Sequence, residues 1–225
     1  LYLIISTAVI IFWIYFSVIA LILFILMSIV HFGLCDWSYL GLKKYKWSVS
    51  LTHGLNIVFG IIFFHTSETF EIFTFLSNLS FNQFQEYLYI VYICYFFLLI
   101  RYAYLAIKFT RLRWGILEMS IILLVIFLTE PLVAFSIYFC FIHTFKHVKS
   151  ILKDTSKYLS NSKFITITTI SFTILTWVGG SLAIIYLHKS FSFDESFIKT
   201  LFIGLAALTL PHMTLVDIFY RRKFN

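Results

Sequence analysis

The chain has 225 residues, of which 61% are hydrophobic and only 12% charged, and its formal net charge is +7. A soluble globular domain is nearer half apolar and a quarter charged, so this composition excludes an ordinary soluble protein and indicates an integral membrane protein. The apolar runs are continuous instead of alternating, which excludes a β-barrel and predicts an all-α, polytopic transmembrane helix bundle. With only two prolines and eight glycines, the chain is expected to form a single domain over residues 1–225.

The expected membrane spans follow the long apolar runs. Residues 1–33 exceed the about 20 residues that one span needs, so they form either one long tilted helix or two helices with a break near residues 15–17. Further spans are expected at about 48–65, 84–107, 114–128, 132–148, 164–187 and 197–220, which makes about seven crossings. The chain opens without an initiator Met or a signal-peptide pattern, and we expect its N-terminal segment to be truncated.

The basic residues alternate with these spans. Fifteen of the seventeen Lys and Arg residues lie in or beside residues 36–47, 101–113, 146–163 and 221–223. The positive-inside rule therefore predicts a multi-pass protein of the cell (inner) membrane with a cytoplasmic C-terminus. Contact with anionic lipids accounts for the basic links, so we expect membrane lipids and no nucleic acid as partners.

The histidines form the clearest candidate site. His143 and His147 are four residues apart in an expected helix, so their side chains share one face and can bind one metal ion together. His31, His53 and His212 lie on other segments, each near a basic link. The topology therefore predicts a layer of five histidines in the cytoplasmic third of the bundle.

A shared metal ion explains this layer better than five separate packing roles, because ionisable side chains are rare inside membrane helices. Imidazole suits iron, copper and zinc, so the ligand type alone does not choose the metal. Asp36 and Asp217 are expected either to orient a ligand and balance charge or to have a simple helix-end role. His65 and His188 fall at the opposite helix ends and are expected to be interfacial.

Four stretches of sequence suggest a family: HFGLCD (31–36), YFCFIHTFKH (138–147), WVGG (177–180) and FIGLAALTLPHMTLVD (202–217). In this order they resemble stretches of the Brp/Blh family. The members of this family are bacterial and archaeal membrane β-carotene 15,15′-dioxygenases that make retinal for rhodopsins. The resemblance implies an enzyme that cleaves β-carotene with O₂ at the central 15,15′ double bond. Its product would be all-trans-retinal, passed to a rhodopsin, and its cofactor a non-haem Fe(II) held by histidines.

The same resemblance implies roles for individual residues. The family's iron ligands, which are also its catalytic residues, correspond to His31, His143 and His147, and a fourth metal ligand to His212. Additional ligands, or residues that support the ligands, correspond to His53, Asp36 and Asp217. The family's N-terminal PHGALD motif, which carries a further ligand histidine, does not occur in this sequence, so the expected domain lacks that helix. Aromatic residues such as Tyr138 are expected either to line a substrate tunnel or to pack between helices.

Other functions of membrane proteins need residues that this sequence lacks or places differently. A desaturase would need HxxHH boxes, and a retinal receptor would need a lysine midway along its last helix, where only Lys199 occurs, at the start. Two alternatives stay open. One is a membrane protein that binds carotenoid or retinal without cleaving it, and the other is a haem protein with His31 facing His143 across two helices.

Overall fold

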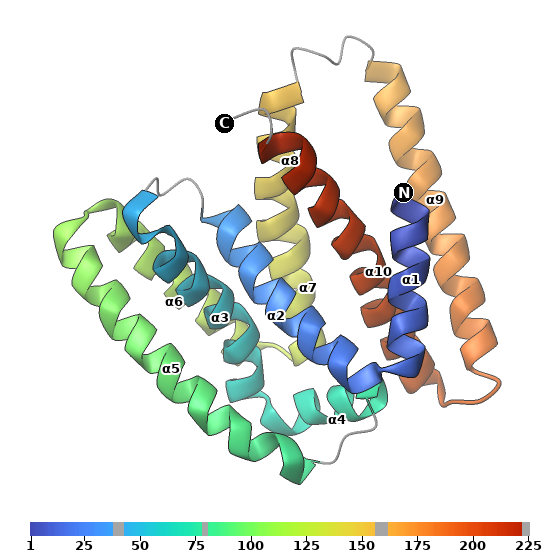
Figure 1. The fold of residues 1–225 in the computed structure, drawn as a ribbon, viewed down its shortest axis with the longest axis horizontal. Helices are drawn as coiled ribbons and strands as arrows, with labels where there is room; N and C mark the ends of the chain where they lie inside the picture. Colours follow the sequence, from blue (N-terminus) through green and yellow to red (C-terminus); the bar gives the residue numbers. More distant parts are fainter. Residues whose placement is uncertain (38–42, 78–80, 156–161, 222–225) are drawn as a thin grey trace. The chain divides into compact units, whose positions relative to one another are not determined.

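The computed structural model describes residues 1–37, 43–77, 81–155 and 162–221, with side chains for 1–37, 44–77, 85, 88–149 and 166–214. These residues are helical without a strand, which confirms the predicted all-α fold (Figure 1). In chain order the elements are α1 (Tyr2–Tyr15), α2 (Ser17–Asp36), η2 (Lys43–Tyr45), α3 (Lys46–Phe64), α4 (Thr66–Ser77), α5 (Phe81–Lys108), α6 (Arg111–Leu128), α7 (Pro131–Ile137), the π turn η3 (Tyr138–His143), α8 (Thr144–Thr155), α9 (Ser162–Leu187) and α10 (Phe193–Arg221).

Within the described residues, six helical stretches are long and apolar enough to cross a membrane. They are Ser17–Asp36, Lys46–Phe64, Leu88–Lys108, Pro131–Lys149, Thr166–Leu187 and Phe193–Thr214. The crossing expected at 114–128 lies in α6, which is not one of the six and which carries Arg111, Arg113 and Glu118. The N-terminal apolar stretch is two helices instead of one, because the chain breaks at Phe16, whose φ is −133° and ψ 51°.

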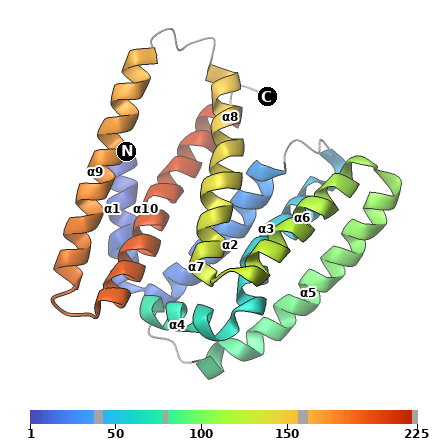
Figure 2. The same cartoon turned by 180° about the vertical axis from the view of Figure 1, so that it is seen from behind.

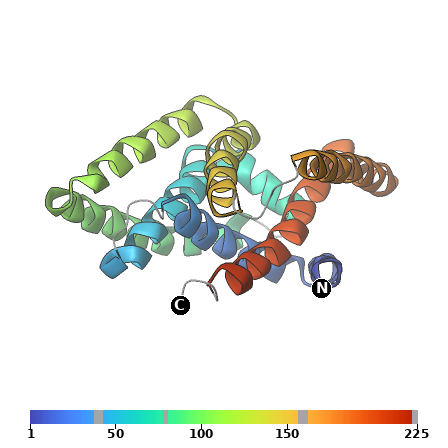
Figure 3. The same ribbon diagram turned by 90° about the horizontal axis from the view of Figure 1, so that it is seen from above.

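The chain divides into two compact units, and the first is formed by the described parts of residues 1–21, 75–78 and 154–225. In this unit α10 lies beside both α1 and α9 (Figures 1 and 3). The hydroxyl of Tyr2 donates to the carbonyl oxygen of Leu208 at 2.8 Å, and the indole of Trp13 donates to that of Leu76 at 3.2 Å. These long-range hydrogen bonds attach α1 to α10 and to the end of α4.

The second unit is formed by the described parts of residues 22–74 and 79–153. Its centre is α3, which packs against α5, α6 and α7 (Figure 2). The hydrophobic core of this unit consists of Phe32, Trp37, Val49, Ile57, Tyr102, Leu105, Ala106, Leu112, Met119, Ile122, Ile126, Ala134 and Tyr138. The expectation of one domain over residues 1–225 stays a prediction.

Two glycines let α2 and α3 touch backbone to backbone in the second unit. A Cβ atom on Gly33 would lie 2.0 Å from the carbonyl oxygen of Ser50. A Cβ atom on Gly54 would lie 1.9 Å from the carbonyl oxygen of Ile29. Small residues allow this close approach between membrane helices, and any larger side chain would push the helices apart. The contact holds the half of α2 that ends at Asp36.

The helix that follows Pro131 changes its geometry before the histidine pair. Over Tyr138–His143 it is a π turn, in which the backbone N–H of Thr144 bonds to the carbonyl oxygen of Phe139, five residues back. In a regular α-helix, residues five apart are about 140° apart around the axis. The wider π turn brings such residues close to the same face. Tyr138 and His143 therefore point in one direction, which the 3.6-residue period did not predict.

Candidate functional site

Three of the predicted ligand histidines come together in the second unit. His31 comes from α2, His143 from the end of η3, and His147 from α8. The ring centroid of His31 lies 5.0 Å from that of His143 and 6.3 Å from that of His147. The rings of His143 and His147 are 5.8 Å apart and nearly parallel, at 9°, as expected for residues four apart in a regular helix. His31 and His143 are buried.

The spacing of the three rings suits a shared metal ion. A metal about 2.1 Å from each imidazole nitrogen lies about 3.2 Å from each ring centroid, so tetrahedral ligands have centroids about 5.2 Å apart. The widest observed pair, His31 and His147 at 6.3 Å, would have to close by about 1 Å to reach this value. Among the described residues, no three His, Cys, Asp or Glu side chains are already arranged around a common metal position. The three rings would therefore have to move before they could hold a metal ion together, and their role as ligands stays a prediction.

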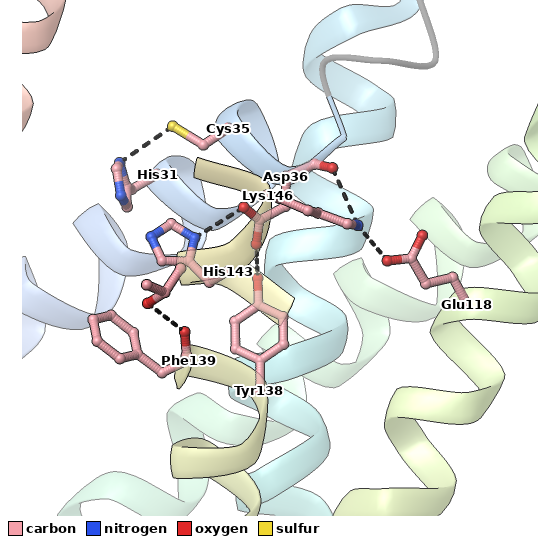
Figure 4. Close-up of polar contacts among 9 residues, drawn as sticks. His31, Cys35, Asp36, Glu118, Tyr138, Phe139, His143 and Lys146 are labelled. Carbon is pink, nitrogen blue, oxygen red and sulfur yellow. Dashed lines mark hydrogen bonds and ion pairs between the residues drawn. The ribbon is translucent and has the colours of Figure 1, made fainter. Parts of the chain in front are cut away.

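Asp36 orients one of these histidines. Its carboxylate is 1% exposed, and its Oδ1 lies 2.9 Å from Nδ1 of His143 (Figure 4). Because a carboxylate can only accept, Nδ1 of His143 is the donor and Nε2 carries the lone pair that binds metals. Metal-binding histidines commonly donate their second N–H to a carboxylate in this way. From the sequence, Asp36 was expected to have either a role in orienting a ligand and balancing charge or a simple helix-end role, and the structure bonds its carboxylate to His143.

Two further groups hold Asp36 in place. The hydroxyl of Tyr138 donates a hydrogen bond to Oδ2 of the carboxylate. Nζ of Lys146 lies 3.4 Å from the main-chain oxygen of Asp36 and 4.3 Å from the ring centroid of Trp37. Lys146 also forms an ion pair with Glu118 of α6. The end of α2 is thus connected to α6, η3 and α8, as Figure 4 shows.

Similarity to known proteins identifies the family of this chain. The family model described as Beta-carotene 15,15′-dioxygenase matches residues 1–220. The chain belongs to this family. A curated relative named Beta-carotene 15,15′-dioxygenase, from Uncultured marine bacterium 66A03, is 29% identical over 220 residues, which is 98% of this chain and 79% of the relative. No solved structure matches the chain. The family resemblance that the four sequence stretches suggested is therefore confirmed.

In this β-carotene 15,15′-dioxygenase family member, His31 makes a polar contact within α2. Its Nδ1 lies 3.6 Å from Sγ of Cys35, one helical turn later. The contact orients the ring, because it places Nε2 on the opposite edge of the imidazole. Cys35 was not among the residues predicted from the sequence, and its i,i+4 relation to His31 is the signal that would have linked the two.

His53 is part of the packed core, and the proposed role of an additional ligand stays a prediction. Its ring stacks on that of Trp37 at 3.4 Å between centroids and an interplanar angle of 12°. Its Nε2 lies 3.0 Å from the hydroxyl of Tyr102, while its buried Nδ1 has no hydrogen-bond partner among the described residues. Trp37 directly follows Asp36, so His53 supports the same end of α2 through stacking.

The remaining predicted residues divide between the two units. His65 ends α3, where its Nε2 lies 2.6 Å from the carbonyl oxygen of Ile126, about 18 Å along the helix from His53. His212 on α10 and His188 after α9 belong to the first unit. The role of His212 as a metal ligand stays a prediction, and the side chain of Asp217 lies outside the described residues.

Proposed function

We propose that this chain cleaves β-carotene with O₂ at the central 15,15′ double bond, at a non-haem Fe(II) bound by His31, His143 and His147. The observation that carries the proposal is the grouping of these three imidazoles in one unit, with Asp36 bonded to Nδ1 of His143. Membership of the β-carotene 15,15′-dioxygenase family supports the substrate and the bond that is cleaved. The stretch 202–217, which resembles the family and contains His212, adds this histidine to the proposed ligand set.

The proposed reaction balances without a further reactant. One carbon–carbon double bond breaks, two carbon–oxygen double bonds form, and each retinal molecule takes one atom of O₂. The four electrons that reduce O₂ come from the double bond, so no reductant is needed. Bound Fe(II) supplies the site where dioxygen and the double bond meet, and imidazole ligands suit iron.

The chain itself contributes orientation and an apolar environment. Phe32 meets the ring of His143 edge-on at 5.0 Å, and Phe139 stacks on it at 5.4 Å between centroids. Such aromatic neighbours exclude water from the ligand side chains, which strengthens their polar interactions. Phe139, which is partly exposed, also offers the kind of surface on which an apolar polyene packs. Positioning of the double bond next to the metal, more than acid–base chemistry, is the proposed contribution of the protein.

The test is made in the membrane. Cells that produce β-carotene would express the full-length protein, its His143→Ala variant and its His188→Ala variant, and extracted pigments would be separated by chromatography. We expect retinal from the parent and from His188→Ala, because His188 lies at the end of α9, and none from His143→Ala. Equal membrane levels of the three proteins serve as the control. Retinal formation by His143→Ala would contradict the proposed metal site, and pigment bound without retinal would favour a carotenoid-binding protein.

A further inference from the structure

Tyr138 makes a contact that the proposed cleavage chemistry does not itself require. Its side chain is 2% exposed, and its hydroxyl donates to Oδ2 of Asp36, the carboxylate whose Oδ1 binds His143. The π turn makes this arrangement, since it places Tyr138 and His143 on one face although they are five residues apart. One carboxylate thus joins two side chains of the same helical turn.

The two hydrogen bonds of Asp36 depend on each other. The oxygens of a carboxylate belong to one rigid plane, so a bond that holds Oδ2 also sets the direction of Oδ1. Without the Tyr138 hydroxyl, Oδ2 would lose a partner in a buried position, and a buried acceptor left unpaired is costly. The carboxylate would then turn toward another donor and release the ring of His143. Lys146, a cation beside Asp36, already contacts Glu118 and the main-chain oxygen of Asp36.

We infer that Tyr138 is a positioning residue, which acts through Asp36 to aim Nε2 of His143 at the metal. This inference rests on the proposed function, because it assumes that His143 is a ligand. It assigns to Tyr138 a role other than lining a tunnel for the substrate. Removal of the hydroxyl is therefore expected to weaken metal binding even when no carotenoid is present.

The test measures metal binding by the purified full chain in detergent, with Co²⁺ alone as the probe. Loss of a residue that supports a metal ligand typically lowers metal affinity by about 10–100-fold. We expect this loss, with a changed visible spectrum of the bound Co²⁺, for Tyr138→Phe. The matched control is Tyr95→Phe, which removes a partly buried hydroxyl bonded to Oδ1 of Asn56 at 2.6 Å, away from Asp36. The control is expected to bind Co²⁺ as the parent does.

A double-mutant cycle tests the route through Asp36. Asp36→Asn alone should lower Co²⁺ affinity. Adding Tyr138→Phe to this variant should lower the affinity little further, because the effects of substitutions at two coupled residues do not add. Full additivity of the two losses would overturn the inference, as would parent-like affinity and spectrum in Tyr138→Phe, or equal losses in Tyr138→Phe and Tyr95→Phe. A parent that binds no Co²⁺ would instead refute the proposed metal site, and the inference with it.

Discussion

The backbone contact between α2 and α3 makes a stability prediction whose size follows from the structure. In Gly33→Ala the new Cβ would lie 2.0 Å from the carbonyl oxygen of Ser50, whereas ordinary contacts begin at 3.4 Å. The helices must therefore separate by more than 1 Å, and no side-chain rotation can relieve the clash because the neighbouring atom is backbone. Overpacking of this kind costs about 1–3 kcal/mol, and a backbone clash belongs at the upper end.

The measurement is the unfolding temperature of the purified protein in detergent. About 3 kcal/mol corresponds to a decrease of roughly 6–12 °C for a chain of this size. The matched control is Gly179→Ala in α9, where an added Cβ would meet nothing within 4 Å. Alanine favours a helix over glycine, so the control should be unchanged or slightly more stable. An unfolding temperature of Gly33→Ala equal to that of the parent would refute the close contact of α2 and α3.

Three further predictions concern the metal and the membrane topology. His147→Ala is expected to lose retinal formation while inserting normally, because it removes one ligand and the fold rests on helix packing; bleaching of carotene-producing cells at the parental rate would contradict this. Treatment of the purified protein with an Fe²⁺ chelator should abolish cleavage, and added Fe²⁺ but not Mg²⁺ should restore it. A reporter fused after Asn225 should be active only in the cytoplasm, because the basic links favour that side; periplasmic activity would refute this topology.

The helices and the family were predictable from the sequence, because both follow from local information. Apolar runs of about 20 residues define membrane spans. The predicted i,i+4 relation of His143 and His147 agrees with the structure, because a regular helical turn connects them. The break at Phe16 was one of two alternatives, because the single polar residue Ser17 does not decide between a break and a continuous helix, and the change itself lies in the backbone dihedrals.

The support of the site was not predictable in the same way. The bond of Asp36 to His143 joins segments more than 100 residues apart, and no local periodicity reports such a contact. The contact of Tyr138 with Asp36 was not predicted, because the π turn shifts the helix register and counting at 3.6 residues per turn places Tyr138 on another face than His143. Lys146 was read as part of a basic link, although it lies over Trp37 beside the site.

Isotope labelling with reconstituted iron tests the central claim most directly. The purified protein, stripped of metal and reloaded with one Fe²⁺ per chain, would be given β-carotene and ¹⁸O₂, and the aldehydes would be reduced at once to retinol to prevent oxygen exchange with water. We predict two retinol molecules per β-carotene, each with one ¹⁸O atom, and no product without iron. Cleavage by the metal-free protein, or retinol without label from ¹⁸O₂, would contradict an iron-dependent dioxygenase.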